Sequence, residues 1–331
     1  IIYNNNFMIL TILGATGLVG KEIIKILEEK ENKAIKKIIF VATEKSKGKK
    51  IKYKNKEYNV ITVDQALKQK PTHALFSAGA KASKRYAKEF NKIGAIVIDN
   101  SSAFRMNKNI KLIVPEINGK TISKKDKIIS NPNCSTIQLI MAIAMIQKKI
   151  GIKRIVISTY QSVLGTGIKA VEQLKSEENK KEPKQRAYKN KIHRNIIPKC
   201  DDFCENGYTK EEEKIIKETN KILKTNIKIT ATAVRVPTLG GHGESVNIEL
   251  KNKATKRQII GLLKKQKGII VEQGKNYKTP ADVRGKNEVF VSRLREDFSQ
   301  KNTYNMWVVS DPLRKGAATN AVQILELLIN N

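Results

Sequence analysis

Apolar and polar residues alternate along the first 130 residues in a pattern of short buried strands followed by helices. The run MILTIL at residues 8–13 precedes three regularly spaced glycines and a helix expected over 21–29. Strands that alternate with helices indicate a parallel sheet with right-handed crossover connections. The later segments of this pattern are apolar runs at 37–42, 74–77 and 95–98 and a helical stretch near 83–93.

The pattern changes after residue 134. Residues 209–223 predict a helix with Thr209 as its N-cap, because acidic residues fill the first turn. The polar, lysine-rich segment 175–195 is interpreted as an excursion over the surface. The other expected elements are an apolar helix over 136–148, strands over 152–160, 227–236 and 245–250, and an amphipathic helix over 316–329.

A chain of 331 residues exceeds the usual size of one hydrophobic core, so we expect two domains. The fold class is predicted to be α/β, with a parallel-sheet domain over 8–133 to which the C-terminal helix 316–330 is assigned. An α+β domain is expected over 134–315.

The net charge of +33 raises the question of a nucleic-acid partner. The chain has 53 Lys and 11 Arg, however, and the lysines are scattered along the whole sequence. Readers of phosphates and base edges favour the bidentate fork of arginine. The excess of Lys, Asn and Ile is therefore interpreted as codon drift, and no specific nucleic-acid binding is expected.

The sequence predicts neither a signal peptide nor a membrane-spanning helix, and neither disulfide bonds nor a metal site. The longest apolar stretch, 135–147, is too short to cross a bilayer, and residues 1–7 lack the basic start of a signal peptide. Met8 is a candidate start, which would make residues 1–7 an ill-ordered extension. An odd number of cysteines (Cys134, Cys200 and Cys204) favours free thiols, and no second Cys/His pair has metal-site spacing. We therefore expect a cytoplasmic protein.

Three glycines stand between the first strand and the first helix. Gly14, Gly17 and Gly20 would let backbone N–H groups approach a dinucleotide pyrophosphate at the start of a helix. The spacing GxxGxxG is less specific than GxGxxG, and a tight strand-to-helix turn alone would also need these glycines.

The loop after the second strand bears on the choice of dinucleotide. Thr43, Lys45, Ser46 and Lys49 form a polar, cationic cluster that suits a ribose 2′-phosphate. A carboxylate at Glu44 would repel that phosphate if it pointed inward. The cluster favours NADP and leaves the preference over NAD open.

Cys134 and His242 are the candidate catalytic residues. Pro132 and Asn133 predict a turn that places Cys134 at a helix N-terminus, where the helix dipole stabilises a thiolate and helix N–H groups can face an oxyanion. A buried structural cysteine would fit the same position. His242 lies between glycines in GGHGE and lacks the apolar neighbours of a core histidine, so it is the candidate acid/base.

From Ile9 to about Leu328, the chain resembles the aspartate-semialdehyde dehydrogenase family. The resemblance implies a Rossmann-type dinucleotide-binding domain and a catalytic and dimerisation domain. The matching blocks are GATGLVG (14–20), NSSAFRM (100–106), SNPNCST (130–136), STYQSVLGTG (158–167), ENGYTKEEEK (205–214), RVPTLGGHGES (235–245) and LRKGAATNAVQI (313–324).

The resemblance also implies roles for individual residues. Cys134 would be the nucleophile, His242 the general acid/base and Gln161 the residue that orients the acyl group. The remaining implied roles are substrate α-carboxylate binding by Arg235, α-ammonium binding by Glu211, phosphate binding by Arg105 and Lys214, and cofactor lining by Thr16, Leu18, Val19 and the helix around Asn320. Glu211 and Lys214 are three residues apart, so an ordinary surface ion pair would give the same spacing.

The implied reaction is the reductive dephosphorylation of L-4-aspartyl phosphate with NADPH through a Cys134 thioester. Its product, L-aspartate 4-semialdehyde, is a precursor of lysine, methionine and threonine. The family also implies a homodimer formed through the second domain. A related enzyme with a similar Cys/His pair, N-acetyl-γ-glutamyl-phosphate reductase, is the alternative. The chain departs from the family at Gly243, where a serine is frequent, and at Pro312, where an asparagine is common. His193 and Arg194 also replace apolar or aromatic residues.

Overall fold

The computed structural model describes residues 8–330, so the expectation for residues 1–7 lies outside the described part of the chain. Contacts divide the chain into two compact units, residues 1–132 with 317–331 and residues 133–316. The first unit is therefore discontinuous in sequence, and the second is inserted between its last strand and its last helix.

The first unit contains a fully parallel six-stranded sheet with the strand order β2-β1-β5-β6-β8-β7. Because every strand runs in the same direction, a crossover connection joins each strand to the next. This arrangement confirms the predicted Rossmann-type architecture. Its strands are β1 (Met8–Leu13), β2 (Ile35–Val41), β5 (His73–Phe76), β6 (Ile96–Asp99), β7 (Lys111–Leu112) and β8 (Ile128–Ser130).

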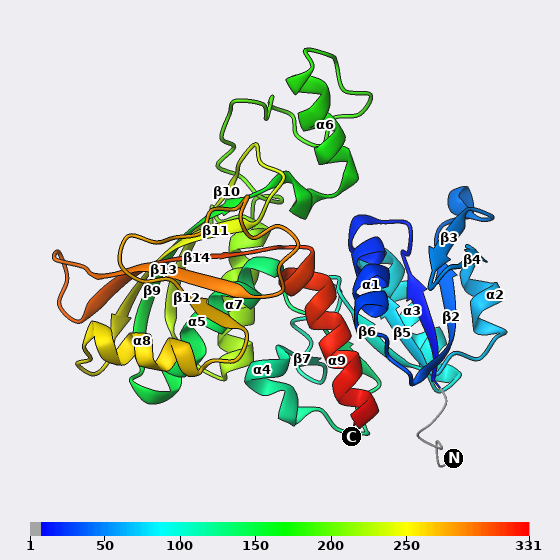
Figure 1. Cartoon of the computed structure of the whole chain (residues 1–331), viewed down its shortest axis with the longest axis horizontal. Helices are drawn as coiled ribbons and strands as arrows, with labels where there is room; N and C mark the ends of the chain where they lie inside the picture. Colours follow the sequence, from blue (N-terminus) through cyan, green and yellow to red (C-terminus); the bar gives the residue numbers. More distant parts are fainter. Residues whose placement is uncertain (1–7, 331) are drawn as a thin grey trace. The chain divides into compact units, whose positions relative to one another are not determined.

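Helices cover both faces of this sheet, as its buried side chains require (Figure 1). One core cluster joins the sheet to α1 and α9, and a second joins the opposite face to α2 and α3. The helices of the unit are α1 (Leu18–Glu29), α2 (Val63–Leu67), α3 (Ala80–Lys92), α4 (Pro115–Asn118) and α9 (Thr319–Asn330). A separate hairpin, β3 (Lys50–Tyr53) and β4 (Lys56–Asn59), follows β2.

The second unit contains a mixed six-stranded sheet with the order β10-β9-β11-β14-β13-β12. The strands are β9 (Ile152–Gln161), β10 (Lys228–Arg235), β11 (His242–Leu250), β12 (Ile269–Val271), β13 (Val289–Glu296) and β14 (Thr303–Ser310). Strand β9 runs parallel to β10 and antiparallel to β11. The carboxyl ends of β9 and β10 and the start of β11 therefore lie at one edge of the sheet.

Three helices pack against this sheet, and the middle one, α5 (Cys134–Lys149), contacts the other two (Figure 1). The apolar helix α5 packs with both α7 (Lys210–Leu223) and α8 (Lys256–Lys265). The predicted cap of α7 is confirmed, because Thr209 and Glu212 form a reciprocal capping box. A π-helical turn at Arg314–Ala318 leads from the second unit into α9.

Several predicted elements differ from those observed. The lysine-rich segment is not solely a surface excursion, because helix α6 (Ile168–Glu178) covers its start and holds the following loop. The side chains of Gln173 and Glu177 accept hydrogen bonds from the backbone of residues 187–188 and 192–193. Strand β11 begins at His242 instead of residue 245, because Gly243 and Glu244 also pair with β9.

Candidate active site

The glycine turn of the first unit leaves the N-terminus of α1 uncapped. Gly17 is the N-cap and has no side chain that could accept from the first-turn N–H groups of Leu18 and Val19. Gly14 has a φ of +89°, and a Cβ there would lie 2.7 Å from the backbone oxygen of Ser77. A Cβ at Gly20 would collide with the backbone oxygen of Gly14. Residues 14 and 20 are therefore restricted to glycine. The first backbone N–H groups of α1 have no side-chain cap, so they are available to a pyrophosphate.

The loop after β2 forms a short 3₁₀ turn, Glu44–Ser46, with Thr43 as its N-cap residue. Thr43 and Lys45 are exposed, and Ser46 is half-buried. The Glu44 side chain is 74% exposed and lies 3.9 Å from the ammonium of Lys47. It therefore faces solvent and a cation, and does not point inward as the sequence left possible.

Asn320 and Arg105 also belong to the first unit. The fully buried amide of Asn320 donates to the carbonyl of Ile113 at 2.9 Å and to Oδ1 of Asn131 at 2.7 Å, which joins α9 to the sheet. The Arg105 guanidinium donates to the carbonyl of Asn100 at 2.8 Å. Lys214, its predicted partner in phosphate binding, is in the second unit.

Cys134 is the first residue of α5, where the sequence predicted it, and is partly exposed. The N-cap Asn133 accepts from the backbone N–H groups of Ser135 and Thr136 at 3.0 and 3.2 Å. These two N–H groups are therefore already bonded, and the expectation that they face an oxyanion does not hold for them. Gly316 lies against the cysteine, because a Cβ there would be 2.9 Å from Cys134 Cβ.

Two carboxylates fix Asn133 in place. Glu218 accepts from its backbone N–H at 2.7 Å, and Glu211 accepts from its side-chain amide at 2.8 Å. Both acids come from α7, so that helix holds the turn that carries Cys134. The sequence predicted Asn133 only as part of the turn before Cys134 and gave no role to Glu218, because a helix-start signal does not name the distant groups that orient the cap.

His242 is fully buried at the start of β11. Its Nδ1 accepts from the backbone N–H of Ser162 at 3.1 Å, so the neutral ring carries its proton on Nε2. Burial and the Arg235 guanidinium lower the pKa of His242 to about 3. The imidazole is therefore neutral across the physiological range, with Nε2–H as its remaining polar group.

Three predicted residues occupy one edge of the second sheet. Arg235 pairs with Gln161 in the register of β10 and β9, and His242 begins the strand on the other side of β9. The Arg235 guanidinium donates to the carbonyl of Ser162 at 2.8 Å. A Cβ at Gly165 would lie 2.9 Å from His242 Nε2 and 3.1 Å from Arg235 Nη1, so this glycine leaves room for both side chains.

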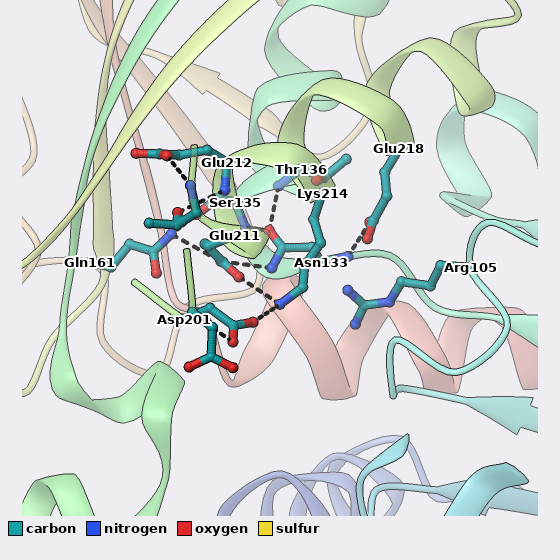
Figure 2. Close-up of polar contacts among 12 residues, drawn as sticks. Arg105, Asn133, Ser135, Thr136, Gln161, Asp201, Glu211, Glu212, Lys214 and Glu218 are labelled. Carbon is teal, nitrogen blue, oxygen red and sulfur yellow. Dashed lines mark hydrogen bonds and ion pairs between the residues drawn. The ribbon is translucent and has the colours of Figure 1, made fainter. Parts of the chain in front are cut away.

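Glu211 connects this edge to the cysteine helix, and Figure 2 shows the polar groups around it. The Gln161 amide donates to Glu211 at 3.1 Å and to the Ser135 hydroxyl at 2.9 Å. Burial alone would raise the pKa of Glu211, but the Lys214 ammonium, the Asn133 amide and Arg235 together lower it to about 2. Glu211 is therefore a buried, ionised carboxylate.

Lys214 lies between two acids, 3.1 Å from Glu211 and 2.7 Å from Asp201 (Figure 2). The pair Glu211–Lys214 is thus largely buried and joined to other polar groups, unlike an ordinary surface ion pair. The sequence did not predict Asp201 as a site residue. Its segment, CDDFC, was considered only for metal binding by the two cysteines, and the contact with Lys214 has no local sequence signal.

The departure at Gly243 has a structural reason. The indole of Trp307, from the neighbouring strand β14, covers Gly243, and a Cβ at that position would collide with the ring. A serine beside His242 would therefore require Trp307 to move.

Comparison with known proteins agrees with this arrangement of two units. Residues 10–125 match the family model "Semialdehyde dehydrogenase, NAD binding domain", and residues 143–315 match "Semialdehyde dehydrogenase, dimerisation domain". These matches define an oxidoreductase of the semialdehyde dehydrogenase class, with a pyridine-nucleotide-binding domain. No helix within residues 8–330 is long and apolar enough to cross a membrane.

Curated relatives narrow the class. The aspartate-semialdehyde dehydrogenase of Aquifex aeolicus is 45% identical to this chain, over 96% of this chain and 97% of that protein. The enzyme of the same name from Bacillus subtilis is 42% identical, over 96% of each chain. The crystal structure of aspartate semialdehyde dehydrogenase II from Vibrio cholerae complexed with ASA has a TM-score of 0.94 at 39% identity, covering 98% of this chain and 99% of that one. The chain belongs to the aspartate-semialdehyde dehydrogenase family.

Replacement of Gly165 tests the packing around His242. Gly165→Ala should lower turnover by roughly 10- to 100-fold, because the added methyl would displace the imidazole or the guanidinium from its present position. Steady-state kinetics measure the loss. Gly261→Ala in α8, where a Cβ meets nothing within 4 Å, is the control and should retain full turnover. Full activity of Gly165→Ala would show that the His242 site tolerates the methyl.

Proposed function

We propose that this chain converts L-4-aspartyl phosphate to L-aspartate 4-semialdehyde with NADPH, as an aspartate-semialdehyde dehydrogenase. The supporting observation is the Gln161 amide, which joins Ser135, the neighbour of Cys134, to the buried carboxylate of Glu211. One side chain thus spans the distance from the proposed nucleophile to the proposed ammonium-binding acid. Such a product would be a precursor of lysine, methionine and threonine. Residues 8–133 with 316–330 are proposed as the NADP-binding domain, and 134–315 as the catalytic domain.

Charge complementarity supports the proposed substrate-binding roles. The ionised Glu211 suits an α-ammonium, and the buried Arg235 suits an α-carboxylate, for which guanidinium geometry is well matched. Lys214 is proposed to bind the phosphate group and would exchange its contact with Asp201 for one with a phosphate oxygen. The same role is proposed for Arg105 of the first unit.

In the proposed chemistry the Cys134 thiolate attacks the acyl carbon, the bond to phosphate breaks, and a thioester forms on the cysteine. The Gln161 amide orients the acyl group during this step. A bound NADPH supplies the hydride that reduces the thioester. The Nε2–H of the neutral His242 donates a hydrogen bond to the substrate oxygen as negative charge develops there. It keeps this bond while the C–S bond breaks, which releases the aldehyde and restores the Cys134 thiolate.

The cofactor fits the residues of the first unit. Gly14, Gly17 and Gly20 and the uncapped start of α1, with Thr16, Leu18 and Val19, would hold the pyrophosphate. Thr43, Lys45 and Ser46 are proposed to bind the 2′-phosphate of NADP, and the outward orientation of Glu44 removes the repulsion that would oppose it. Asn320 lies buried beside the end of the sheet and is proposed to line the nicotinamide region.

The alternative substrate, an N-acetylated γ-glutamyl phosphate, is not favoured. Acetylation removes the charge of the amine, and the buried anion at Glu211 would then lose its cationic partner on the substrate. The curated relatives described above also carry the aspartate-semialdehyde name.

Purified protein with phosphate and NADP⁺ should oxidise L-aspartate 4-semialdehyde and show little turnover of N-acetyl-L-glutamate 5-semialdehyde. Absorbance of the reduced nicotinamide measures the rate. Cys134→Ala should abolish turnover while cofactor binding is retained, because the sulfur forms the acyl bond. Cys204→Ala, which also removes a partly exposed free thiol, is the matched control and should remain active. A preference for the acetylated substrate, or substantial turnover by Cys134→Ala, would contradict the proposal.

The double variant Lys45→Ala/Lys49→Ala should weaken NADPH binding by roughly tenfold and leave NADH binding nearly unchanged. Loss of one charge-assisted hydrogen bond to a phosphate costs about 1.5 kcal/mol. Titration of both nucleotides measures the two dissociation constants. Lys36→Ala/Lys37→Ala removes the same charge at the other end of β2 and should leave both constants unchanged. Equal losses for NADPH and NADH would rule out a 2′-phosphate site in this loop.

A homodimer formed through the second unit is also proposed. The face of its sheet that carries Tyr160 and Trp307 forms a groove with Ser245 on its wall, and the two rings lie 5.7 Å apart. Aromatic side chains of this kind are enriched at protein interfaces. The match to a dimerisation domain supports a dimer formed through this unit.

Sedimentation equilibrium of the intact chain should give the mass of a dimer. Ser245→Arg adds bulk and a fourth cation to a groove that Lys278, Arg293 and Arg295 already line, and should shift the equilibrium towards monomer through steric overlap and like-charge repulsion. A monomeric wild-type chain at micromolar concentration would contradict the dimer. A stable dimer of Ser245→Arg would place the interface elsewhere.

A further inference from the structure

Glu244 is a buried acid that the proposed reaction does not use. It lies on β11 two residues after His242, on the same face of the strand, and is fully inaccessible to solvent. In the register of the sheet it stands opposite Thr159 of β9 and Val308 of β14. Because an ionised carboxylate is unfavourable in a position without solvent, the protonation state of Glu244 depends on the groups around it.

The polar groups around Glu244 come from the cysteine helix. Ser135 and Gln138 of α5 are close enough to lower its pKa, but burial dominates and raises the pKa well above its ordinary value. Neither carboxyl oxygen makes a hydrogen bond of normal length and angle, or an ion pair, with a described residue. The hydroxyl of Thr159 opposite it likewise lacks a partner within the described chain.

An ionised carboxylate in this place would be strongly unfavourable. A buried charge without a cation costs several kcal/mol, so the group takes up a proton instead. A neutral carboxyl carries one donor and still accepts hydrogen bonds. This matches surroundings that offer the donors of Ser135 and Gln138 and the hydroxyl oxygen of Thr159.

Two polar connections lead from Glu244 to the proposed site. Ser135 accepts from the Gln161 amide at 2.9 Å, so its own hydroxyl proton is directed elsewhere. Gln138 donates to the backbone carbonyl of His242 at 3.2 Å and accepts from Ser310 at 2.7 Å, so one amide proton remains for another acceptor. Glu244 is the acceptor that lies next to both donors.

We propose that Glu244 is a neutral carboxylic acid that positions Gln161 through Ser135 and the start of β11 at His242 through Gln138. It does not touch substrate and acts through these two residues. Its neutrality matters as well, because an anion beside Ser135 would repel the thiolate one residue earlier in α5. The kinetic part of this inference rests on the proposed function, whereas the protonation of Glu244 does not.

Infrared spectroscopy tests the protonation directly. The difference spectrum between wild type and Glu244→Gln at neutral pH should contain the carbonyl band of a protonated carboxyl. Glu249→Gln, on the same strand, is the matched control and should instead show loss of carboxylate bands, because Lys153 lies 2.6 Å from that ionised acid. Absence of the protonated band in the Glu244→Gln difference would overturn the proposal, whether or not the protein turns over the proposed substrate.

Kinetics test the positioning. Glu244→Leu should lower kcat by roughly 10- to 100-fold with a smaller change in KM, because Gln161 and His242 would lose their orientation. Glu244→Gln should restore most of kcat with an unchanged pH profile, since it replaces one neutral hydrogen-bonding group by another. Wild-type kcat in Glu244→Leu, or a displaced pH profile in Glu244→Gln, would refute the role. If Glu244→Leu fails to fold, the pH profile of kcat in Glu244→Gln and the infrared band of the protonated carboxyl still test whether Glu244 is neutral.

Discussion

The hydrogen bonds of Asn133 hold together the part of the second unit that carries the proposed nucleophile, Cys134. One side chain caps the helix that begins with Cys134, and two acids of α7 hold the cap itself. A cap contributes about 1 kcal/mol to a helix, which is modest for stability. Its larger effect here is geometric, because the direction of α5 and the position of the sulfur follow from where Asn133 is fixed.

The second unit holds two buried titratable groups in opposite states: the Glu211 carboxyl is ionised and the His242 imidazole is neutral. Glu211 remains ionised because cations and amides surround it, whereas His242 is neutral because burial and a neighbouring guanidinium oppose its protonation. The uncharged amide of Gln161 donates to Glu211, and Gln161 ends the strand that pairs with the one His242 begins. This arrangement places an ionised carboxylate and a neutral N–H donor in the same buried region.

Local signals made much of the fold predictable, and contacts between distant segments set its limits. The glycine turn after β1, the start of α5 and the cap of α7 each depend on a few adjacent residues, and the structure has them where the sequence placed them. Neither α6 nor the pairing of β13 with β14 was predicted, because their patterns resemble ordinary polar loops and amphipathic runs. The contact of Asp201 with Lys214 joins segments 13 residues apart and leaves no local trace. The roles of the predicted site residues remain predictions.

The contact between Gly316 and Cys134 has a consequence for how the chain connects its two units. These residues stand close to the two ends of the second unit, so the polypeptide enters and leaves that unit at nearly the same point. A module whose ends meet can be accommodated within another with little entropic penalty for closing the host chain. The two chain ends of the second unit therefore lie together, as expected for a compact module inserted into a longer chain.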